Sequence, residues 1–256
     1  MFIVFPDTDH VAQYVSTLFI QRISQQPDVI LGLATGGTME PIYAQWVKQA
    51  LARNIDVSQV STFNLDEYVG LPAQHPQSYA AYMEHHLLRH LAFDRSRIHI
   101  PDGLAHDLPA YCQAYSDTIR DHGGIAMQLL GVGSNGHIGF NEPGTPFDSQ
   151  CHVVELSERT RIDNSRFFGP NEIVPASAIT MGMRDIMDAH EIILVATGSS
   201  KAATIAKYYE HEVSPLVPFT ILKQHPKAHI ILDAAAAALV PSNVCQFYDT
   251  VPAAML

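Results

Sequence analysis

The feature that most constrains the fold is an alternation of short apolar runs with longer amphipathic segments along the 256 residues. Runs such as Phe2–Phe5 and Val60–Leu65 have the length and composition of β-strands. Segments such as Asp9–Gln25 and Glu40–Arg53 repeat apolar residues at helical spacing. Because parallel strands need crossover connections of about this length, the alternation predicts a mostly parallel sheet.

The predicted strands are apolar on both faces, as expected where helices cover both sides of a sheet. In the second helix, Ile42, Trp46 and Leu51 are expected to face inward. No internal repeat and no linker divides the chain. The sequence therefore predicts an α/β fold, doubly wound and Rossmann-like, with helices on both faces and a single domain over residues 1–256. Further strands are expected at 28–34, 126–132, 191–196 and 228–232, and further helices near 78–91, 111–122, 200–210 and 234–239.

Residues 144–175 interrupt this alternation with irregular sequence. One interpretation is a lid that closes over a ligand and excludes water. The other is a plain surface excursion, because connecting segments usually run over the surface. The sequence leaves both interpretations open.

The charge of the chain limits its partners. Fifteen Lys and Arg against 26 Asp and Glu give a net charge of −11. Nucleic acid and anionic membranes are therefore not expected as partners. Only 16% of the residues are charged and 47% are hydrophobic, which excludes a disordered chain and predicts a large core with a partly apolar surface. An anionic ligand would have to be held by a few local positive groups.

Three cysteines, Cys112, Cys151 and Cys245, lie far apart and are odd in number. Such usage is typical of reduced thiols in a cytosol. The segment Met1–Pro6 lacks the basic lead and the length of a signal peptide. No apolar run reaches the ~18–20 residues of a membrane helix. The expected location is the cytoplasm.

Ligands of parallel α/β folds bind at the carboxyl ends of the strands, and three strand ends carry unusual residues. The first is Thr35-Gly36-Gly37-Thr38. Two glycines let the backbone bend, and its N–H groups together with a helix N-terminus form a phosphate site. This is neither a Walker loop nor the dinucleotide fingerprint. A tight turn with an ordinary Thr cap is the alternative.

The second strand end carries two adjacent carboxylates, Asp66 and Glu67, after an apolar run. Adjacent residues of a strand point in opposite directions, so only one is expected to face a substrate. That carboxylate would act as a general base. A solvated acidic turn is the alternative.

The third strand end is a loop in which five glycines between Gly131 and Gly144 surround His137. Histidine is the side chain best suited to move protons near neutral pH. Glu142 follows five residues later and is placed to orient the imidazole. The alternative is a structural turn with a surface histidine. The histidines and cysteines lack metal-ligand spacing, so no metal is expected.

Taken together, these segments resemble the glucosamine-6-phosphate deaminase (isomerase) family. The similarity runs from Thr35–Thr38 through Asn64–Leu71 and Gly136–Gly144 to Gly198–Ala202. The family reaction converts glucosamine 6-phosphate and water into fructose 6-phosphate and ammonium. It needs no redox cofactor, so the resemblance implies a small-molecule amino sugar phosphate as the partner and no cofactor.

The resemblance also implies roles for single residues. His137 matches the residue that opens the sugar ring, and Asp66 matches the base that moves a proton from carbon 2 to carbon 1. Glu142 matches the carboxylate paired with the histidine, and Glu67 is expected to support its neighbour. Asn135 stands beside His137 as a further member of the catalytic set. The residues expected to bind substrate or phosphate are Thr35, Gly36, Gly37, Thr38, Gly136, Arg166 and Lys201.

The chain departs from the family pattern at a few positions. Asn135 stands where many members have Asp, which places the chain in an Asn-Gly-His branch. The segment 147–152 has no Lys or Arg, whereas allosteric members carry basic residues there. The tail is also shorter, so a non-allosteric protein is expected. Monomer and homo-oligomer both remain open.

Three other functions compete with this prediction. A galactosamine-6-phosphate deaminase/isomerase shares most motifs, although Tyr68, Phe140 and Arg166 favour the glucosamine epimer. A 6-phosphogluconolactonase shares the fold and a Gly-His loop. A non-catalytic sugar-phosphate sensor would have no need for both Asp66 and His137, and such sensors carry a basic helix-turn-helix.

Overall fold

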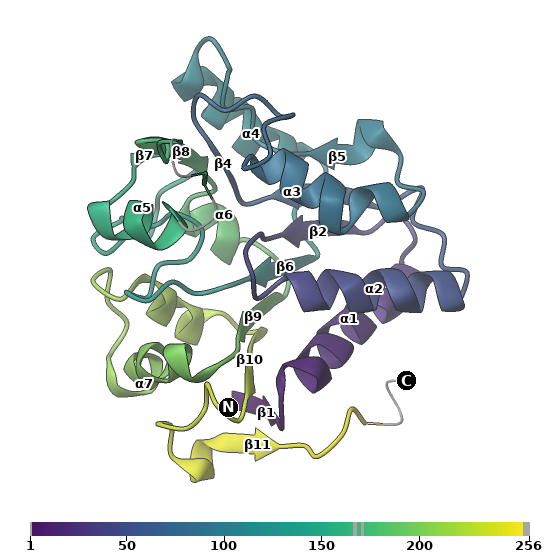
Figure 1. Ribbon diagram of the computed structural model, residues 1–256, viewed down its shortest axis with the longest axis vertical. Coiled ribbons are helices and arrows are strands. Elements are labelled where there is room, and N and C mark those ends of the chain that lie inside the picture. The colour runs from purple at the N-terminus through teal and green to yellow at the C-terminus, as the bar shows by residue number, and fades with distance from the viewer. Residues whose placement is uncertain (1, 166–167, 170–171, 253–256) are drawn as a thin grey trace.

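The computed structural model describes residues 2–165, 168–169 and 172–252, and its main layer is an eight-stranded sheet (Figure 1). The strand order is β11-β1-β10-β9-β6-β2-β3-β5, and every neighbouring pair is parallel. The α/β, doubly wound, mostly parallel fold expected from the sequence is thereby confirmed. The strands are β1 (Phe2–Phe5), β2 (Ile30–Leu33), β3 (Ser61–Asn64), β5 (Ile98–His99), β6 (Met127–Leu130), β9 (Ile192–Ala196), β10 (Ala228–Asp233) and β11 (Cys245–Phe247).

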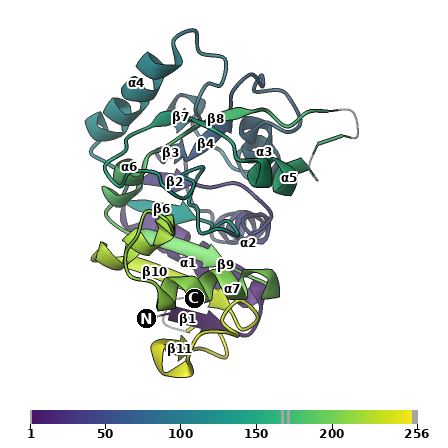
Figure 2. The ribbon, with the colours of Figure 1, turned by 90° about the vertical axis from the view of Figure 1, so that its left-hand side faces the viewer.

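Helices cover both faces of this sheet, because right-handed crossovers in opposite directions leave from opposite faces. The connections β1-β2-β3-β5 run one way and carry α1, α2 and α3 on one face. The connections β5-β6-β9-β10 return and carry α4, α6 and α7 on the other, so that α4 and α6 lie across the sheet from α2 and α3 (Figure 2). These helices are α1 (Thr8–Gln25), α2 (Glu40–Ala52), α3 (Tyr79–His86), α4 (Leu108–Asp121), α6 (Met183–Met187) and α7 (Ala202–Glu210).

The point where the winding reverses lies between β2 and β6, which are neighbours in the sheet. The helix after β2 covers one face and the chain after β6 returns along the other, so the two strand ends diverge. Such a reversal opens a crevice at the carboxyl ends of the strands, where ligands of this fold class bind. The fold therefore places a site next to the loops that follow β2 and β6.

A second, three-stranded sheet stands beside the first, with the order β4-β8-β7 and antiparallel pairing. Its strands are β4 (Asp66–Tyr68), β7 (His152–Glu155) and β8 (Ser177–Thr180). The segment 144–175, expected to be irregular, contains β7 and the helix α5 (Glu158–Ser165). A small cluster of Tyr68, Phe140, Leu156, Val174 and Ala178 forms the core under this part of the chain.

Two local expectations from the sequence are wrong. Leu51 is 60% exposed, whereas Ile42 and Trp46 are buried. At 100° per residue, position 51 lies about 140° around the helix from position 46, which turns Leu51 toward solvent. The Ala-rich run 234–239 forms turns and no helix. Asp233 accepts the Ala236 N–H at 2.7 Å, and the short run ends before Pro241, which cannot continue a helix.

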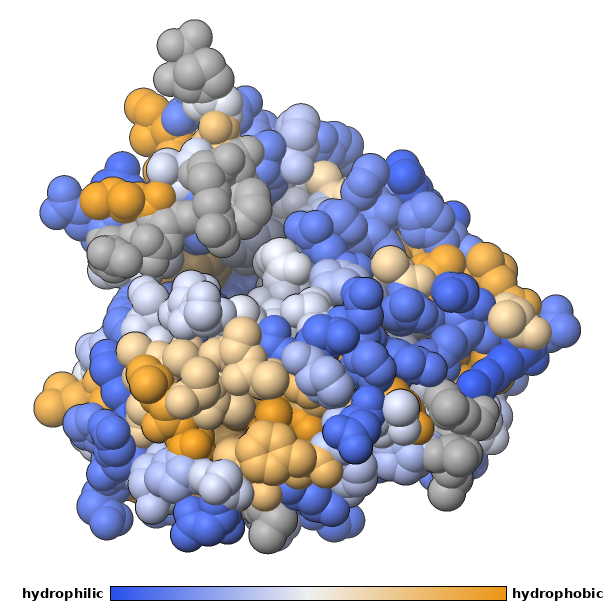
Figure 3. Space-filling model, turned by 60° about the horizontal axis from the view of Figure 1, so that its bottom comes forward, coloured by the Kyte–Doolittle hydropathy of each residue, from blue (hydrophilic) through white to orange (hydrophobic). Residues whose placement is uncertain are grey.

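The surface of the protein is apolar in part. Apolar side chains gather on the face that carries β11 and α7 (Figure 3). In this C-terminal part of the chain, Leu216, Leu239 and Phe247 are more than half exposed. Among the described residues, helices with the length and hydrophobicity to cross a bilayer are absent.

The packing of α1 on α2 generates a stability prediction. Trp46 is fully buried and stacks on Phe19, with ring centroids 4.8 Å apart. Trp46→Ala is expected to lower the free energy of unfolding by about 3–5 kcal/mol, because it opens a cavity between the helices. Leu51→Ala on the same helix is the control and should stay within about 0.5 kcal/mol. Urea unfolding measures both, and similar losses would contradict the assigned helix face.

Candidate active site

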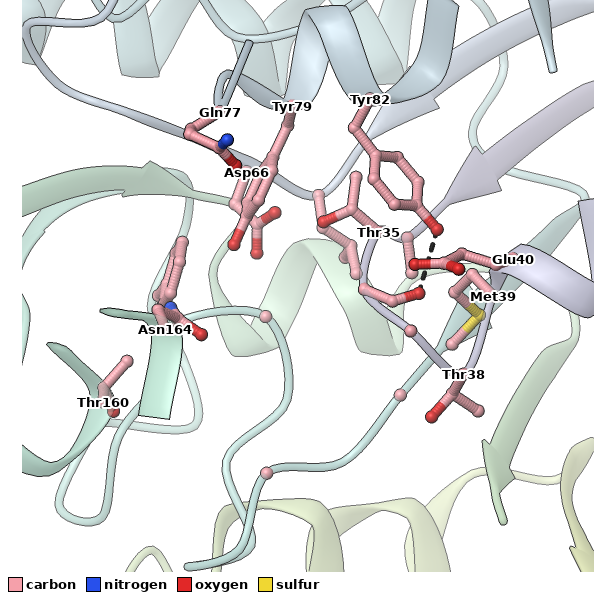
Figure 4. Close-up of a pocket in the computed structure, with 18 of the residues that line it drawn as sticks. Thr35, Thr38, Met39, Glu40, Asp66, Gln77, Tyr79, Tyr82, Thr160 and Asn164 are labelled. Atoms are coloured by element: carbon pink, nitrogen blue, oxygen red, sulfur yellow. Dashed lines mark hydrogen bonds between the residues drawn. The ribbon is translucent and has the colours of Figure 1, made fainter. Parts of the chain in front are cut away.

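A cavity of about 910 Å³ opens at the carboxyl ends of four adjacent strands, β9, β6, β2 and β3. Figure 4 shows its two sides, with Thr35 and Thr38 on one and Thr160 and Asn164 of α5 on the other. Asp66 and Tyr79 lie between them. The sequence-predicted residues that line this cavity are Thr35, Gly36, Gly37, Thr38, Asp66, His137 and Lys201.

The loop after β2 forms one end of the cavity. Helix α2 begins behind this loop with Met39 as its N-cap, and Met39 makes no side-chain capping bond. The alternative, in which a threonine caps helix α2, is therefore wrong. A residue of helix α3 holds the loop in place, because the Tyr82 hydroxyl donates to the Gly36 carbonyl at 2.9 Å (Figure 4). Uncapped N–H groups at a helix start favour an anion.

A cation reaches the same end of the cavity from the neighbouring strand. Lys201 lies in the turn after β9, and its Nζ donates to the Val132 carbonyl at 2.7 Å. Val132 belongs to the loop after β6, so the ammonium group lies between two strand ends. Thr197 and Ser200 line the cavity beside it. Arg166, the other predicted cation, lies outside the described residues.

The two adjacent carboxylates diverge as the strand geometry predicts. Asp66 lines the cavity, and a Cβ built on Gly139 would lie 3.6 Å from its Oδ2, so this carboxylate lies against the His137 loop. Glu67 points the other way and accepts the N–H groups of Tyr68, Tyr79 and Ala80, each at 2.9 Å. Glu67 thus anchors the start of α3 and does not line the cavity.

Burial raises the pKa of both carboxyl groups. Asp66 is 6% exposed, and burial together with the negative charge of Glu67 raises its pKa to about 8. Burial also raises the pKa of Glu67, although the three backbone N–H groups oppose this shift. A carboxylate whose pKa is near the operating pH is well suited to take up and return a proton.

His137 is held by a short chain of polar groups. Its Nδ1 lies 2.7 Å from Asn135 Oδ1, and Asn135 Nδ2 donates to Glu142 Oε2 at 2.5 Å. Nδ1 of His137 is 3.8 Å from the other oxygen of Glu142. Asn135 therefore bridges the histidine and the carboxylate that the sequence paired directly.

These hydrogen bonds between Glu142, Asn135 and His137 fix the tautomer of the imidazole. An ionised carboxylate only accepts hydrogen bonds, so the NH₂ end of Asn135 must face Glu142. The carbonyl end then faces His137, and Nδ1 must carry the proton. In the neutral ring, Nε2 is left with a lone pair, and the ring lines the cavity. His137 is thereby prepared to act as a base through Nε2.

Two glycines of this loop disfavour a side chain, Gly133 for lack of space and Gly136 through its backbone conformation. A Cβ on Gly133 would lie 2.1 Å from the His137 ring, so this glycine lets the imidazole pack against the backbone. Gly136 has a φ of +91°, donates its N–H to Gly133 and accepts the Phe219 N–H. Gly136 was expected to bind substrate, but it lies against Val217 and Phe219 and does not line the cavity.

Sequence reasoning missed several residues that line the cavity, among them Gln77, Tyr79, Tyr82, Thr160 and Asn164. Tyr79 and Tyr82 share one face of α3, a spacing visible in the sequence but uninformative without a known neighbour. Gln77 belongs to the loop before this helix. Among the described residues, no group of three or more His, Cys, Asp or Glu side chains is arranged to hold a metal ion.

One cavity at the strand ends of this α/β protein thus brings together an uncapped helix start, a buried carboxylate and a histidine held by hydrogen bonds, an arrangement suited to acid–base chemistry. A family model described as glucosamine-6-phosphate isomerases/6-phosphogluconolactonase matches residues 7–231. The chain belongs to this family.

Individual members of the family differ in how similar they are to this chain. A glucosamine-6-phosphate deaminase of Shouchella clausii is 48% identical over 231 residues, which are 90% of this chain and 94% of the relative. One of Staphylococcus aureus is 46% identical over 92% of both chains. A solved structure of a monomeric glucosamine-6-phosphate deaminase has a TM-score of 0.91 at 39% identity and covers 93% of this chain and 100% of its own. A 6-phosphogluconolactonase from Leishmania guyanensis, 19% identical with a TM-score of 0.74, shares the fold.

The burial of Asp66 generates a prediction about stability and pH. Its pKa is about 8 in the folded protein and about 3.9 in an unfolded chain. Between these values the folded state binds more protons, so this contribution to stability is complete below the lower value. It is lost as pH rises through the higher one.

Asp66→Asn removes the titrating group and should gain stability over the wild type as pH rises. The expected gain in unfolding free energy is at least about 1 kcal/mol between about pH 5 and pH 8. Asp121→Asn, an exposed change on α4, is the control and should show no such trend. Urea unfolding across this range measures the difference, and a gain independent of pH would contradict the prediction.

Proposed function

We propose that this protein converts glucosamine 6-phosphate and water into fructose 6-phosphate and ammonium. The observation that carries the proposal is the position of Asp66 and His137 in one cavity with the Thr35–Thr38 loop and Lys201. Family membership and the names of the relatives support the same activity. The three free thiols support a cytoplasmic location.

The phosphate would be held at the end of the cavity formed by the Thr35–Thr38 loop. Backbone N–H groups at the start of α2, the two threonine hydroxyls and Lys201 offer donors and one positive charge. Arg166 is proposed as a second cation. Binding at this end would fix the far end of the sugar and direct carbons 1 and 2 toward Asp66.

Ring opening is assigned to His137. Nε2 would take the proton of the anomeric hydroxyl and return it to the ring oxygen, so the ring opens without net change in protonation. The imidazolium formed between these steps is stabilised through Asn135 by the Glu142 carboxylate. Glu142 thus acts on the ring through the amide.

Isomerisation and loss of the amine are assigned to Asp66. The ionised carboxylate would take the proton from carbon 2 while an ammonium proton passes to the carbon 1 oxygen, giving an enolamine, the nitrogen analogue of an enediol. Return of the first proton to carbon 1 leaves an iminium at carbon 2. Water then replaces nitrogen at carbon 2, and ammonium leaves. One buried carboxylate is sufficient for both proton transfers, because carbons 1 and 2 are neighbours and Asp66 is largely shielded from solvent.

The proposal is tested by incubating the protein separately with glucosamine 6-phosphate, galactosamine 6-phosphate and 6-phosphogluconolactone. Ammonium and ketose phosphate should form from the glucosamine epimer at least about tenfold faster than from its epimer. Asp66→Asn should lower kcat by about 10²–10⁴, and the exposed Asp121→Asn should leave kcat unchanged. Absence of ammonium from both amino sugars would refute the deaminase, and lactone hydrolysis alone would favour the lactonase.

The bridge at Asn135 generates a separate prediction. Asn135→Asp removes the amide that donates to Glu142, but its own carboxylate accepts directly from His137 Nδ1 and can stabilise the imidazolium in place of the bridge, so activity should be retained. Glu142→Gln removes the charge that stabilises the imidazolium and should lose most of kcat, about tenfold or more. Steady-state kinetics of the two variants provide the comparison. Equal losses would show that the amide and the carboxylate do not divide the work in this way.

A further inference from the structure

Glu142 is held from two sides. Its Oε2 accepts from Asn135, whereas its Oε1 accepts from the Thr160 hydroxyl and lies 3.2 Å from the Ser157 hydroxyl. The same Oε1 is 3.8 Å from His137 Nδ1. The carboxylate therefore stands between the histidine loop and the start of α5.

The two hydroxyls belong to a fixed helix start. Ser157 caps α5, because its Oγ accepts the Thr160 N–H at 3.1 Å and its carbonyl accepts the Arg161 N–H at 3.0 Å. Thr160 is only 4% exposed. Ser157 Oγ has one proton to give, either to Thr160 Oγ1 at 3.0 Å or to Glu142. In both cases Thr160 donates to Glu142, because the carboxylate only accepts.

The other end of α5 is attached to the strand that carries the proposed base. Asn164 Nδ2 donates to the Tyr68 hydroxyl at 2.9 Å, and Tyr68 follows Asp66 by two residues on β4. Tyr79, on the α3 side, donates to the same hydroxyl at 3.4 Å. Thr160 and Asn164 occupy the same side of the cavity (Figure 4). Helix α5 thus contacts both acid–base elements through its own polar side chains.

We propose that Thr160 is a positioning residue that acts on His137 through Glu142, an inference that rests on the proposed function. Its hydroxyl holds Oε1 of the carboxylate, which keeps Oε2 on the Asn135 amide. The amide in turn keeps the proton on Nδ1 of His137, so that the lone pair of the neutral ring is on Nε2. Without the hydroxyl, the carboxylate is free to turn away from the Asn135 amide. The amide can then rotate and present its NH₂ end to Nδ1, which no longer favours a proton on that nitrogen.

The inference is tested first by Thr160→Val, which keeps the shape of the side chain and removes its hydroxyl. Because His137 moves protons and does not bind the phosphate, kcat should fall about tenfold while KM changes less than about twofold. The pH profile of kcat should shift as well. Thr160→Ser restores the hydroxyl and should recover kcat to within about twofold. Thr118→Val on α4, where the hydroxyl donates to Ala114, is the matched control and should leave kcat unchanged.

A double-mutant cycle separates a positioning role from a merely structural one. In a Glu142→Gln background, Thr160→Val should cost less than about twofold in kcat, because the group through which Thr160 acts is already lost. The same tenfold loss in both backgrounds would overturn the inference, and so would a Thr160→Val variant with wild-type kcat and pH profile. If Thr160→Val does not fold, Thr160→Ala serves in the same cycle.

A readout without substrate keeps this inference distinct from the proposed function. Nitrogen NMR of the imidazole should report the Nδ1–H form of His137 in the wild type and in Thr160→Ser, and a loss of that preference in Thr160→Val. An unchanged tautomer in Thr160→Val would refute the positioning role, whatever the substrate is. If the wild type releases no ammonium but the tautomer changes as expected in Thr160→Val, the deaminase function is refuted and the positioning role of Thr160 is not.

Discussion

The parallel pairing of β9, β6, β2 and β3 is the constraint on which the rest of the site depends. Parallel strands end on the same edge of a sheet, so four loops far apart in sequence meet at one cavity. Reversal of the winding between β2 and β6 keeps helices from filling that edge. Without this parallel strand order, the loops that carry Thr35, Asp66, His137 and Lys201 would not meet at one edge of the sheet.

A second constraint is that the site lies between two sheets. Residue Asp66 begins β4 of the small sheet immediately after β3 ends in the large one, and Glu67 faces away to hold α3. The boundary therefore buries one carboxylate against the cavity and satisfies the other with backbone N–H groups. Burial raises the pKa of Asp66 to about 8, so the fold itself supplies a group able to exchange protons near neutral pH.

Much of this arrangement could be predicted, because strand ends and glycine-rich loops leave local signals. Thr35–Thr38, Asp66 and His137 were each recognisable from neighbouring residues, and their shared edge followed from the parallel topology. Leu51 shows where such reasoning fails, because apolar character alone does not set the buried face, and five residues of helix turn Leu51 about 140° away from Trp46. The helix predicted at 234–239 is wrong for a different reason. Alanine favours helices, but Asp233 accepts the Ala236 N–H and Pro241 follows, so the short run forms turns.

The sequence by itself determined the fold class, the family resemblance and the residue types that carry the chemistry, because these follow from periodicity and local motifs. Only the tertiary structure decided that Asn135 bridges His137 and Glu142, and that Thr160 closes the other side of that carboxylate. The tertiary structure also places Tyr79 and Asn164 in the lining of the cavity and Gly136 outside it. Hydrogen bonds between distant segments depend on distance and orientation, and no local pattern in the chain encodes either.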